Sequence, residues 1–437
     1  MRIQPVFFAN PVYYKQDLFL SVAGSLLGQI QELAPSGTEL LPPVHLFDQV
    51  EVDRFISTSS SAIPLLVTLS GATQSWVLSV AKSAERSLLW WYFPGDGLFS
   101  EPTETLIRGI VARNALPAVM DCWAHLRNRN VGIEKVFDKA SLQEKCAMAA
   151  AMERIRSTRL LIIGYTQQWV VSASVDQRRI EDHLGIECVH IGLEELFTAY
   201  HDIPRGPESA EFARDYLGSA LACREPVAEN VEDAYRLYLG VRKLLELNHC
   251  NALTISCFSL VKQLGVTSCL ALSLLNDDPR IIAACEGDLD AAVSMVIGKA
   301  VSGRPVFMGN PIYHLDDTLD IVHCTAPRRL IGEGEPKYTV RSHHETGMSV
   351  AQRIEVPAPR KATIFRVGNE FSEATLFLAD FIGNPEADTC HTQFRFRIDS
   401  THKRLEESLG CHHLVVFGDY VAALRSLFEG PLKIRVR

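Results

Sequence analysis

The sequence IIAACEGDLDAAVSMVIGKAVSG, residues 281–303, contains the signals that decide the fold. Its first five residues are a short apolar run, which predicts a buried strand. Glu286 and Asp288 follow this strand at once, and residues 290–300 then predict a helix that ends just before Gly303. A buried strand that leads directly into a helix indicates an α/β domain.

The same alternation of strands and helices extends from this stretch toward the N-terminus. Short apolar runs closed by turn signals or polar residues predict strands, and longer amphipathic stretches predict helices. The predicted strands are residues 3–9, 63–69, 87–93, 159–163, 187–191 and 252–258, and the predicted helices are residues 105–114, 141–156, 176–184 and 232–247. Such alternation implies parallel pairing through right-handed crossovers. We therefore predict two Rossmann-like, parallel-sheet layer domains, at residues 1–158 and 159–303.

From residue 304 onward the chain changes to short β-rich segments separated by Pro and Gly turns. Apolar residues alternate with arginines over residues 394–398, as in a strand with one exposed face. We predict a β-rich, barrel-like C-terminal domain at residues 304–437. The chain as a whole is then an α/β protein of three domains that pack into one body.

The composition is that of an ordinary globular protein. The 437 residues predict about two to four domains, and 47% hydrophobic against 22% charged residues exclude wholesale disorder. With 43 Lys and Arg against 52 Asp and Glu, the net charge is −9. This acidic balance argues against nucleic acid or an anionic membrane as the main partner.

The start of the chain lacks the order of a secretory signal, and no apolar run approaches about 18 residues. We therefore expect a cytoplasmic protein whose 11 cysteines are reduced thiols. A CxxC motif is absent, as are GxGxxG after a predicted strand, GxxxxGK[ST], HExxH and GxSxG. Their absence argues against the usual nucleotide-binding proteins, zinc proteases and serine hydrolases, although it does not exclude these classes.

Glu286 and Asp288 are placed at the carboxyl end of a predicted buried strand, where open α/β sheets form their ligand crevice. Two carboxylates so close together repel each other unless a cation or a shared proton relieves them. A hard divalent metal ion would do so with oxygen ligands. The alternative interpretation is an acidic helix start, because a helix N-terminus favours negative charge.

The C-terminal third supplies imidazoles. His412 and His413 directly precede the apolar strand at residues 414–417. Adjacent residues of a strand point to opposite faces, so only one of the two histidines can face a given site. The alternative for each is a packed or solvated histidine near a strand end.

Several motifs in one order resemble L-fucose isomerase-like proteins, which are related to the L-fucose and L-arabinose isomerases. The resemblance covers the second two thirds of the chain well and the first third only in layout. The matching segments are residues 159–196, 254–257, 269–273, 284–295, 302–308, 323–327 and 411–419.

The resemblance implies a metal-dependent enzyme that interconverts an aldose and a ketose through an enediol. Mn²⁺ or another divalent cation would be held by Glu286, by Asn310 and by His413, or its neighbour His412. In the family the second position is a carboxylate, whereas Asn310 is an amide. Its oxygen can ligate a cation but cannot accept a proton as a general base. We therefore predict Glu286 and Asp288 as the catalytic acids.

We assign substrate contacts to His323, His412 and Arg304. His323 is a second histidine ligand or a donor to a sugar hydroxyl. Arg304, with the neighbouring arginines at 328 and 329, would suit an anionic substrate such as a sugar acid, phosphate or sulfonate. The alternative is that these are solvated turn arginines. A softer metal such as zinc could instead recruit cysteine thiolates near the site.

The leading hypothesis is a metal-dependent sugar isomerase whose substrate is a small sugar or sugar derivative. The resemblance also implies a homo-oligomer, in which a neighbouring subunit completes the site. A lyase or epimerase on the same scaffold is the first alternative, because Asn310 removes the expected base. The second is a non-catalytic sugar-binding protein that has lost the metal.

Overall fold

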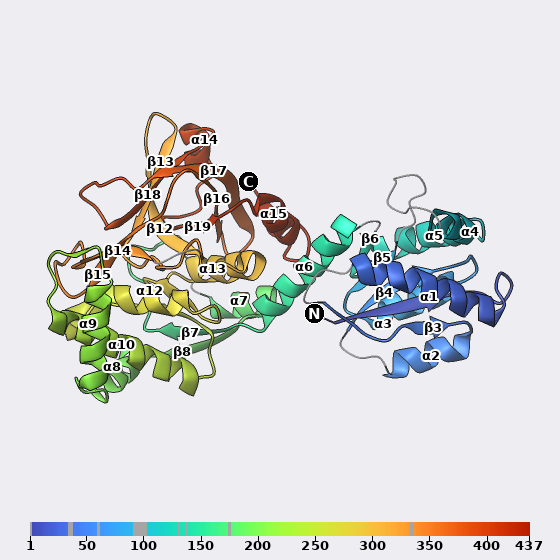
Figure 1. Cartoon of the computed structure of the whole chain (residues 1–437), viewed down its shortest axis with the longest axis horizontal. Helices are drawn as coiled ribbons and strands as arrows, with labels where there is room; N and C mark the ends of the chain where they lie inside the picture. The colour runs from blue at the N-terminus through green and yellow to red at the C-terminus, as the bar shows by residue number, and fades with distance from the viewer. Residues whose placement is uncertain are drawn as a thin grey trace. The chain divides into compact units, whose positions relative to one another are not determined.

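The computed structural model describes residues 2–33, 38–58, 62–90, 103–129, 131–136, 139–173, 176–332 and 336–437. The chain forms two compact units, Met1–Ala150 and Ala151–Arg437. Figure 1 shows the chain with most of the helices and strands labelled.

The first unit is built on a parallel sheet in the strand order β2-β1-β4-β5-β6, with β3 also paired to β1. Its central strands β1 and β4 are apolar almost throughout, and their side chains form the core together with the inner faces of the helices. The strands are β1 (Arg2–Phe8), β2 (Glu39–Leu40), β3 (Val44–Leu46), β4 (Ile63–Thr68), β5 (Ser87–Trp90) and β6 (Ile133–Val136). The helices are α1 (Gln16–Leu33), α2 (Gln49–Thr58), α3 (Gln74–Ser83), α4 (Thr103–Val111), α5 (Ala115–Arg127) and α6 (Lys139–Arg156), of which α6 continues into the second unit.

The second unit begins with a four-stranded parallel sheet in the order β11-β10-β7-β8. The chain enters at β7, adds β8 on one side, and then adds β10 and β11 on the other. The carboxyl ends of β7 and β10 therefore flank the point where the strand order reverses, which is where such sheets bind ligands. The strands are β7 (Arg159–Ile163), β8 (Glu187–Ile191), β10 (Ala252–Ile255) and β11 (Ile282–Cys285).

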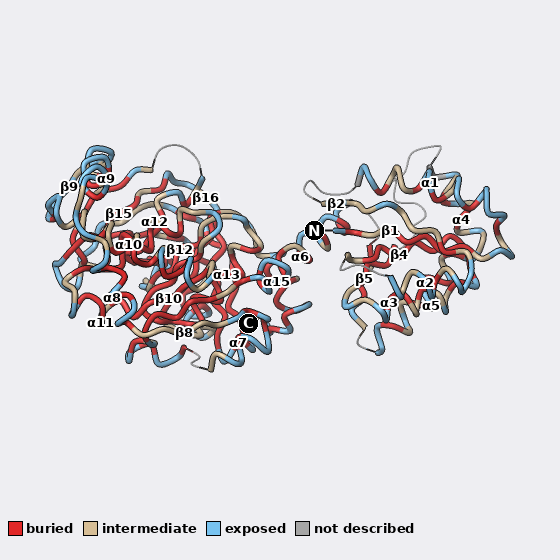
Figure 2. Tube along the Cα trace, turned by 90° about the horizontal axis from the view of Figure 1, so that it is seen from below, coloured by how far each residue is buried: buried red, intermediate tan, exposed pale blue. Residues whose placement is uncertain are grey.

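Helices surround this sheet. Helix α13 lies between the sheet and the C-terminal strands and is buried along nearly its whole length (Figure 2). It runs slightly beyond the predicted residues 290–300, with Asp288 as its N-cap, and it ends just before Gly303, which has a φ of 66° and which the sequence predicts as its end. The helices are α7 (Gln177–Leu184), α8 (Leu193–His201), α9 (Pro207–Gly218), α10 (Ala228–Leu247), α11 (Cys257–Leu264), α12 (Cys269–Asp277) and α13 (Leu289–Ser302).

The C-terminal part is a closed antiparallel barrel of six strands, in the order β16-β19-β12-β13-β18-β17, which closes where β17 pairs with β16. Phenylalanines from four strands fill its interior through edge-to-face contacts. The barrel strands are β12 (Phe307–Tyr313), β13 (Thr318–His323), β16 (Arg360–Gly368), β17 (Glu373–Gly383), β18 (Thr392–Arg397) and β19 (His413–Phe417). Strand β20 (Arg435–Val436) pairs with β17, and helices α14 (Thr401–Glu406) and α15 (Val421–Glu429) complete this part.

A small third sheet joins the two parts of the second unit. Its strand order is β15-β14-β9, from β9 (Ala222–Cys223), β14 (Lys337–Arg341) and β15 (Ala351–Glu355). Because β9 precedes the predicted boundary at residue 303 and its partner β14 follows it, the two parts share backbone hydrogen bonds. The three-domain division at 158 and 303 stays a prediction.

The predicted fold class is confirmed: two parallel sheets are followed by a β-barrel. The predicted strand at 87–93 is present over Ser87–Trp90, and its last three residues lie outside the described part. Helices α11 and α12, which contribute to the pocket below, have no counterpart among the predicted elements. Within the described residues, no helix is both long enough and apolar enough to cross a membrane.

We expect Gly298→Ala to lower the free energy of unfolding by about 1–3 kcal/mol. A Cβ at this position of α13 would lie 2.5 Å from Cζ of Phe365, a fully buried residue of β16. Urea unfolding followed by circular dichroism measures the change. Gly218→Ala in α9 is the control, because its Cβ would meet no atom within 4 Å and should be neutral or slightly stabilising. Equal effects of the two changes would contradict this packing.

Candidate functional site

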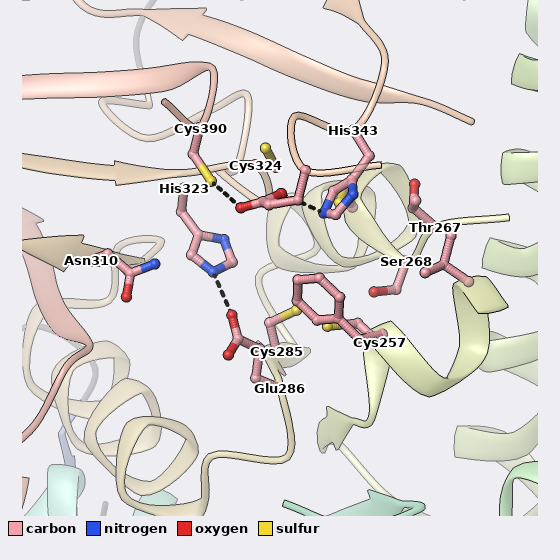
Figure 3. Close-up of a pocket in the computed structure, with 14 residues that line it drawn as sticks. Cys257, Thr267, Ser268, Cys285, Glu286, Asn310, His323, Cys324, His343 and Cys390 are labelled. Atoms are coloured by element: carbon pink, nitrogen blue, oxygen red, sulfur yellow. Dashed lines mark hydrogen bonds and ion pairs between the residues drawn. The ribbon is translucent and has the colours of Figure 1, made fainter. Parts of the chain in front are cut away.

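A pocket with an empty volume of about 410 Å³ opens at the carboxyl edge of the β11-β10-β7-β8 sheet (Figure 3). Residues that follow β10 and β11 form one side. Residues from β12, the end of β13 and the segments around β14 and β18 form the other. The lining residues are Cys257, Phe258, Val261, Thr267, Ser268, Cys269, Cys285, Glu286, Asn310, His323, Cys324, His343, Glu345 and Cys390.

Glu286 is the first residue after β11, and its backbone is held in the left-handed region with a φ of 62°. A non-glycine residue rarely adopts this conformation, and such outliers concentrate at functional sites. The Glu286 carbonyl accepts a hydrogen bond from the Gln167 N–H at 2.9 Å. Gly287 follows with a φ of 65°, and any Cβ there would collide with the Tyr165 carbonyl. The turn therefore fixes the direction of the Glu286 side chain.

The Glu286 carboxylate is buried and faces nitrogen atoms on both sides. The Trp169 indole N–H donates to its Oε2 at 2.7 Å. Its Oε1 lies 3.7 Å from Nε2 of His323 and 3.5 Å from Nε2 of His412. Burial alone would raise the pKa of Glu286, but the two histidines hold this pKa well below its usual value. Glu286 is therefore ionised at neutral pH.

Asp288 orients His412. The carboxylate accepts hydrogen bonds from Nδ1 of His412 at 2.8 Å, from the Arg366 guanidinium at 3.1 Å and from the Ala291 N–H at 2.9 Å. Burial alone would raise the pKa of Asp288, but the charge of Arg366 and the bond to His412 hold it well below the usual value. With Nδ1 engaged, His412 presents Nε2 toward Glu286, and this buried atom has no hydrogen-bond partner among the described residues.

The donor atoms of Glu286, His323 and His412 lie within 4.8 Å of one another, which is compatible with their holding one metal ion. Two imidazoles and one carboxylate are a donor set that divalent transition metals favour. The Nε2 of His412 lies beside the Glu286 carboxylate but makes no hydrogen bond, which fits this interpretation, because a buried polar atom is normally hydrogen-bonded. Asn310 lines the same pocket from β12, on the side of His323 (Figure 3), and offers a neutral oxygen.

A second group of donors lies in the same pocket. Cys324, Glu345 and Cys390 also bring their donor atoms within 4.8 Å of one another. The Cys390 thiol donates to Glu345 at 3.3 Å, and Nε2 of His343 lies 3.0 Å from the other carboxylate oxygen. Thiolates prefer softer metals such as zinc. This group is therefore the place where the softer metal considered from the sequence would bind.

Two predicted site residues lie elsewhere. His413 turns to the face opposite His412, where its Nε2 is 3.0 Å from the Tyr313 hydroxyl, and burial lowers its pKa to about 3. The guanidinium of Arg304 is hydrogen-bonded to the Tyr420 hydroxyl and to the Ile331 carbonyl, and it does not line the pocket. The structure thus places His412, in place of His413, beside Glu286.

Several residues at the site were not assigned to it from the sequence. Trp169 follows β7 and therefore emerges at the same sheet edge as Glu286, which was an available signal. Arg366 lies within the buried part of β16, residues 362–368, and a charge in such a place calls for a buried partner. His343 and Glu345 belong to a loop, whose path the sequence pattern did not reveal.

We expect Asp288→Asn to destabilise the protein by about 3–5 kcal/mol at pH 7, because it leaves the buried Arg366 charge poorly compensated. The carboxylate contributes stability above its unfolded pKa of 3.8, and this contribution is lost as the pH falls toward the lower folded pKa. The difference between wild type and variant should therefore shrink below about pH 4. Chemical unfolding at several pH values measures it.

The control for this prediction is Asp380→Asn. Asp380 pairs with Lys361 on the surface, where both side chains are more than half exposed. The change should stay within about 0.5 kcal/mol at every pH. If Asp288→Asn changes the free energy of unfolding as little as Asp380→Asn does, the buried ion pair does not have the predicted role.

No protein-family model matches the chain. A protein of Clostridium sp. (strain MSTE9) named sulfoquinovose isomerase is 24% identical over 221 residues, which cover 50% of this chain and 49% of that protein. A sulfoquinovose isomerase of Alkalicoccus urumqiensis is 20% identical over 309 residues, 66% of this chain and 68% of that protein. The chain thus matches about half the length of the first relative. These similarities relate the chain to sugar isomerases.

Proposed function

We propose that the chain is a divalent-metal-dependent sugar isomerase that interconverts an aldose and a ketose. The observation that carries the proposal is the convergence of Glu286, His323 and His412, with the buried Nε2 of His412 making no hydrogen bond among the described residues. The names of the two relatives support the same reaction class.

Glu286, His323 and His412 would hold the ion, with Asn310 as a further oxygen donor. Mn²⁺ suits this set, because imidazole, carboxylate and amide oxygens are ligands that it accepts. The ion would polarise two adjacent sugar oxygens and so make the hydrogen on the neighbouring carbon more acidic. Asp288 holds His412 in place and does not face the sugar.

The reaction also needs a group that carries a proton between the two carbons, by way of an enediol. Asn310 cannot accept a proton, and Asp288 is enclosed by Arg366 and His412. Among the described residues that line the pocket, the carboxylates are Glu286 and Glu345. Because Glu286 faces two imidazoles, we assign proton transfer to Glu345, whose side chain is 42% exposed.

Two single substitutions separate these roles. Glu286→Gln should lower both bound metal and turnover, because it removes the anionic ligand. Glu345→Gln should keep the metal and lower kcat by about 100-fold or more, because it removes the proton carrier. Metal analysis of the purified proteins and sugar assays with Mn²⁺ measure both. Turnover that survives Glu286→Gln unchanged would rule out the proposal.

Product analysis in deuterated water identifies the reaction class. An aldose–ketose pair of unchanged carbon number, with solvent deuterium on carbon, is the expected result. Asn310 in place of a carboxylate favours the alternative of a lyase or epimerase, which would give shorter fragments or a stereoisomer. A sugar-binding protein without catalysis would bind the sugar and take up no metal.

The adjacent histidines give a matched pair for the metal. His412→Gln should weaken Mn²⁺ binding about 10- to 100-fold or more, because it removes a ligand. His413→Gln should leave Mn²⁺ binding within a few-fold, since His413 faces Tyr313. Calorimetric titration measures both, and thermal melting shows whether each variant is folded. The opposite order of affinities would assign the ligand to His413.

A further inference from the structure

The described residues that line the pocket include no lysine or arginine. Arg304 is held by Tyr420, and Arg328 is paired with Asp277. Yet both relatives are named for sulfoquinovose, a hexose that carries a sulfonate on its terminal carbon. An anionic substrate would need another kind of binding group here.

The start of helix α12 reaches the pocket and provides such a group. Thr267, Ser268 and Cys269 line the pocket, and the nine-residue helix begins at Cys269. The first N–H groups of a helix have no acceptor within the helix, and the helix dipole adds partial positive charge at this end. Helix N-termini bind sulfate and phosphate groups for this reason.

Ser268 supplies an independent sign of a ligand. It is fully buried, and although it occupies the N-cap position, its side chain makes no capping hydrogen bond. Its hydroxyl has no hydrogen-bond partner among the described residues. The neighbouring Thr267 hydroxyl, by contrast, donates to the Val350 carbonyl at 3.0 Å. A buried hydroxyl left without a hydrogen bond is unfavourable, so a ligand that accepts or donates one there gains affinity.

The two ends of the pocket carry different groups. Figure 3 shows Thr267 and Ser268 at one end of the pocket and Asn310 and His323 at the other, with the Ser268 hydroxyl directed inward. A sugar whose reacting carbons face Glu286 would extend its terminal carbon toward α12.

We propose that the start of α12, with the Ser268 hydroxyl, binds the tetrahedral oxyanion on the terminal carbon of the sugar substrate. The proposal rests on the proposed isomerase function and names its substrate class, a terminally sulfonated sugar. The hydroxyl and the first N–H groups of the helix donate to the sulfonate oxygens. The sulfonate is therefore bound by a hydroxyl and backbone N–H groups in place of lysine or arginine side chains.

The test compares sulfoquinovose with quinovose, the same sugar without the sulfonate, in the Mn²⁺-loaded full chain. Wild type should prefer sulfoquinovose. Ser268→Ala should lower kcat/KM for sulfoquinovose about 10-fold, mainly through KM, and leave quinovose within about twofold. Ser268→Asp should abolish turnover of sulfoquinovose by charge repulsion and spare quinovose. Glucose 6-phosphate tells whether a phosphate is accepted in place of the sulfonate.

Ser400→Ala is the matched control. Ser400 caps helix α14 with a conventional bond to the Lys403 N–H and lies outside the pocket, so its loss should change neither sugar's kinetics. Equal effects of Ser268→Ala on both sugars, or no preference in wild type, would overturn the anion site. If no sugar is isomerised, the proposed function fails. In that case, calorimetric titration with sulfoquinovose tests the anion site independently of turnover. Weaker binding to Ser268→Asp than to wild type would support the site, and equal binding would refute it.

Discussion

The site depends on one buried ion pair. Arg366 of the barrel strand β16 and Asp288 at the start of α13 are both fully buried, and they join the barrel to the parallel sheet. Arg366 also donates to the His412 carbonyl at 2.9 Å, while Asp288 accepts from the His412 ring. A buried ion pair is weak evidence for stability as such. Here it fixes the position of a histidine that faces Glu286 and engages the ring through Nδ1, as supporting residues of metal sites do.

The ligand atoms proposed for the metal come from both the parallel sheet and the barrel. The sheet edge contributes Glu286 on a constrained turn, and the barrel contributes His323 and Asn310 on strands. Neither part alone contains the three residues that meet at the proposed metal position. Formation of the site is therefore coupled to the packing of α13 between sheet and barrel.

Much of the fold could be predicted from the sequence, because short apolar runs and helix boundaries are local signals. The strand before Glu286 and the helix end at Gly303 were both of this kind. The sequence pattern could not identify which of His412 and His413 faces the pocket. Alternation along a strand predicts that they face opposite sides, but it does not predict which side is inward. Arg304 was assigned to the site by proximity along the chain, which does not determine the direction of a long side chain. Glu345 lies on a loop, and loop paths depend on tertiary packing.

The central claim is that Glu286, His323 and His412 form a metal centre that Asp288 and Arg366 hold in place. Anomalous diffraction from crystals soaked in Mn²⁺ tests it most directly. We expect one strong peak bonded to Glu286, His323 and His412, on the side of the pocket that Asn310 lines. A peak bonded to His413 or to the cysteines at 324 and 390, or no peak beside Glu286, would contradict it.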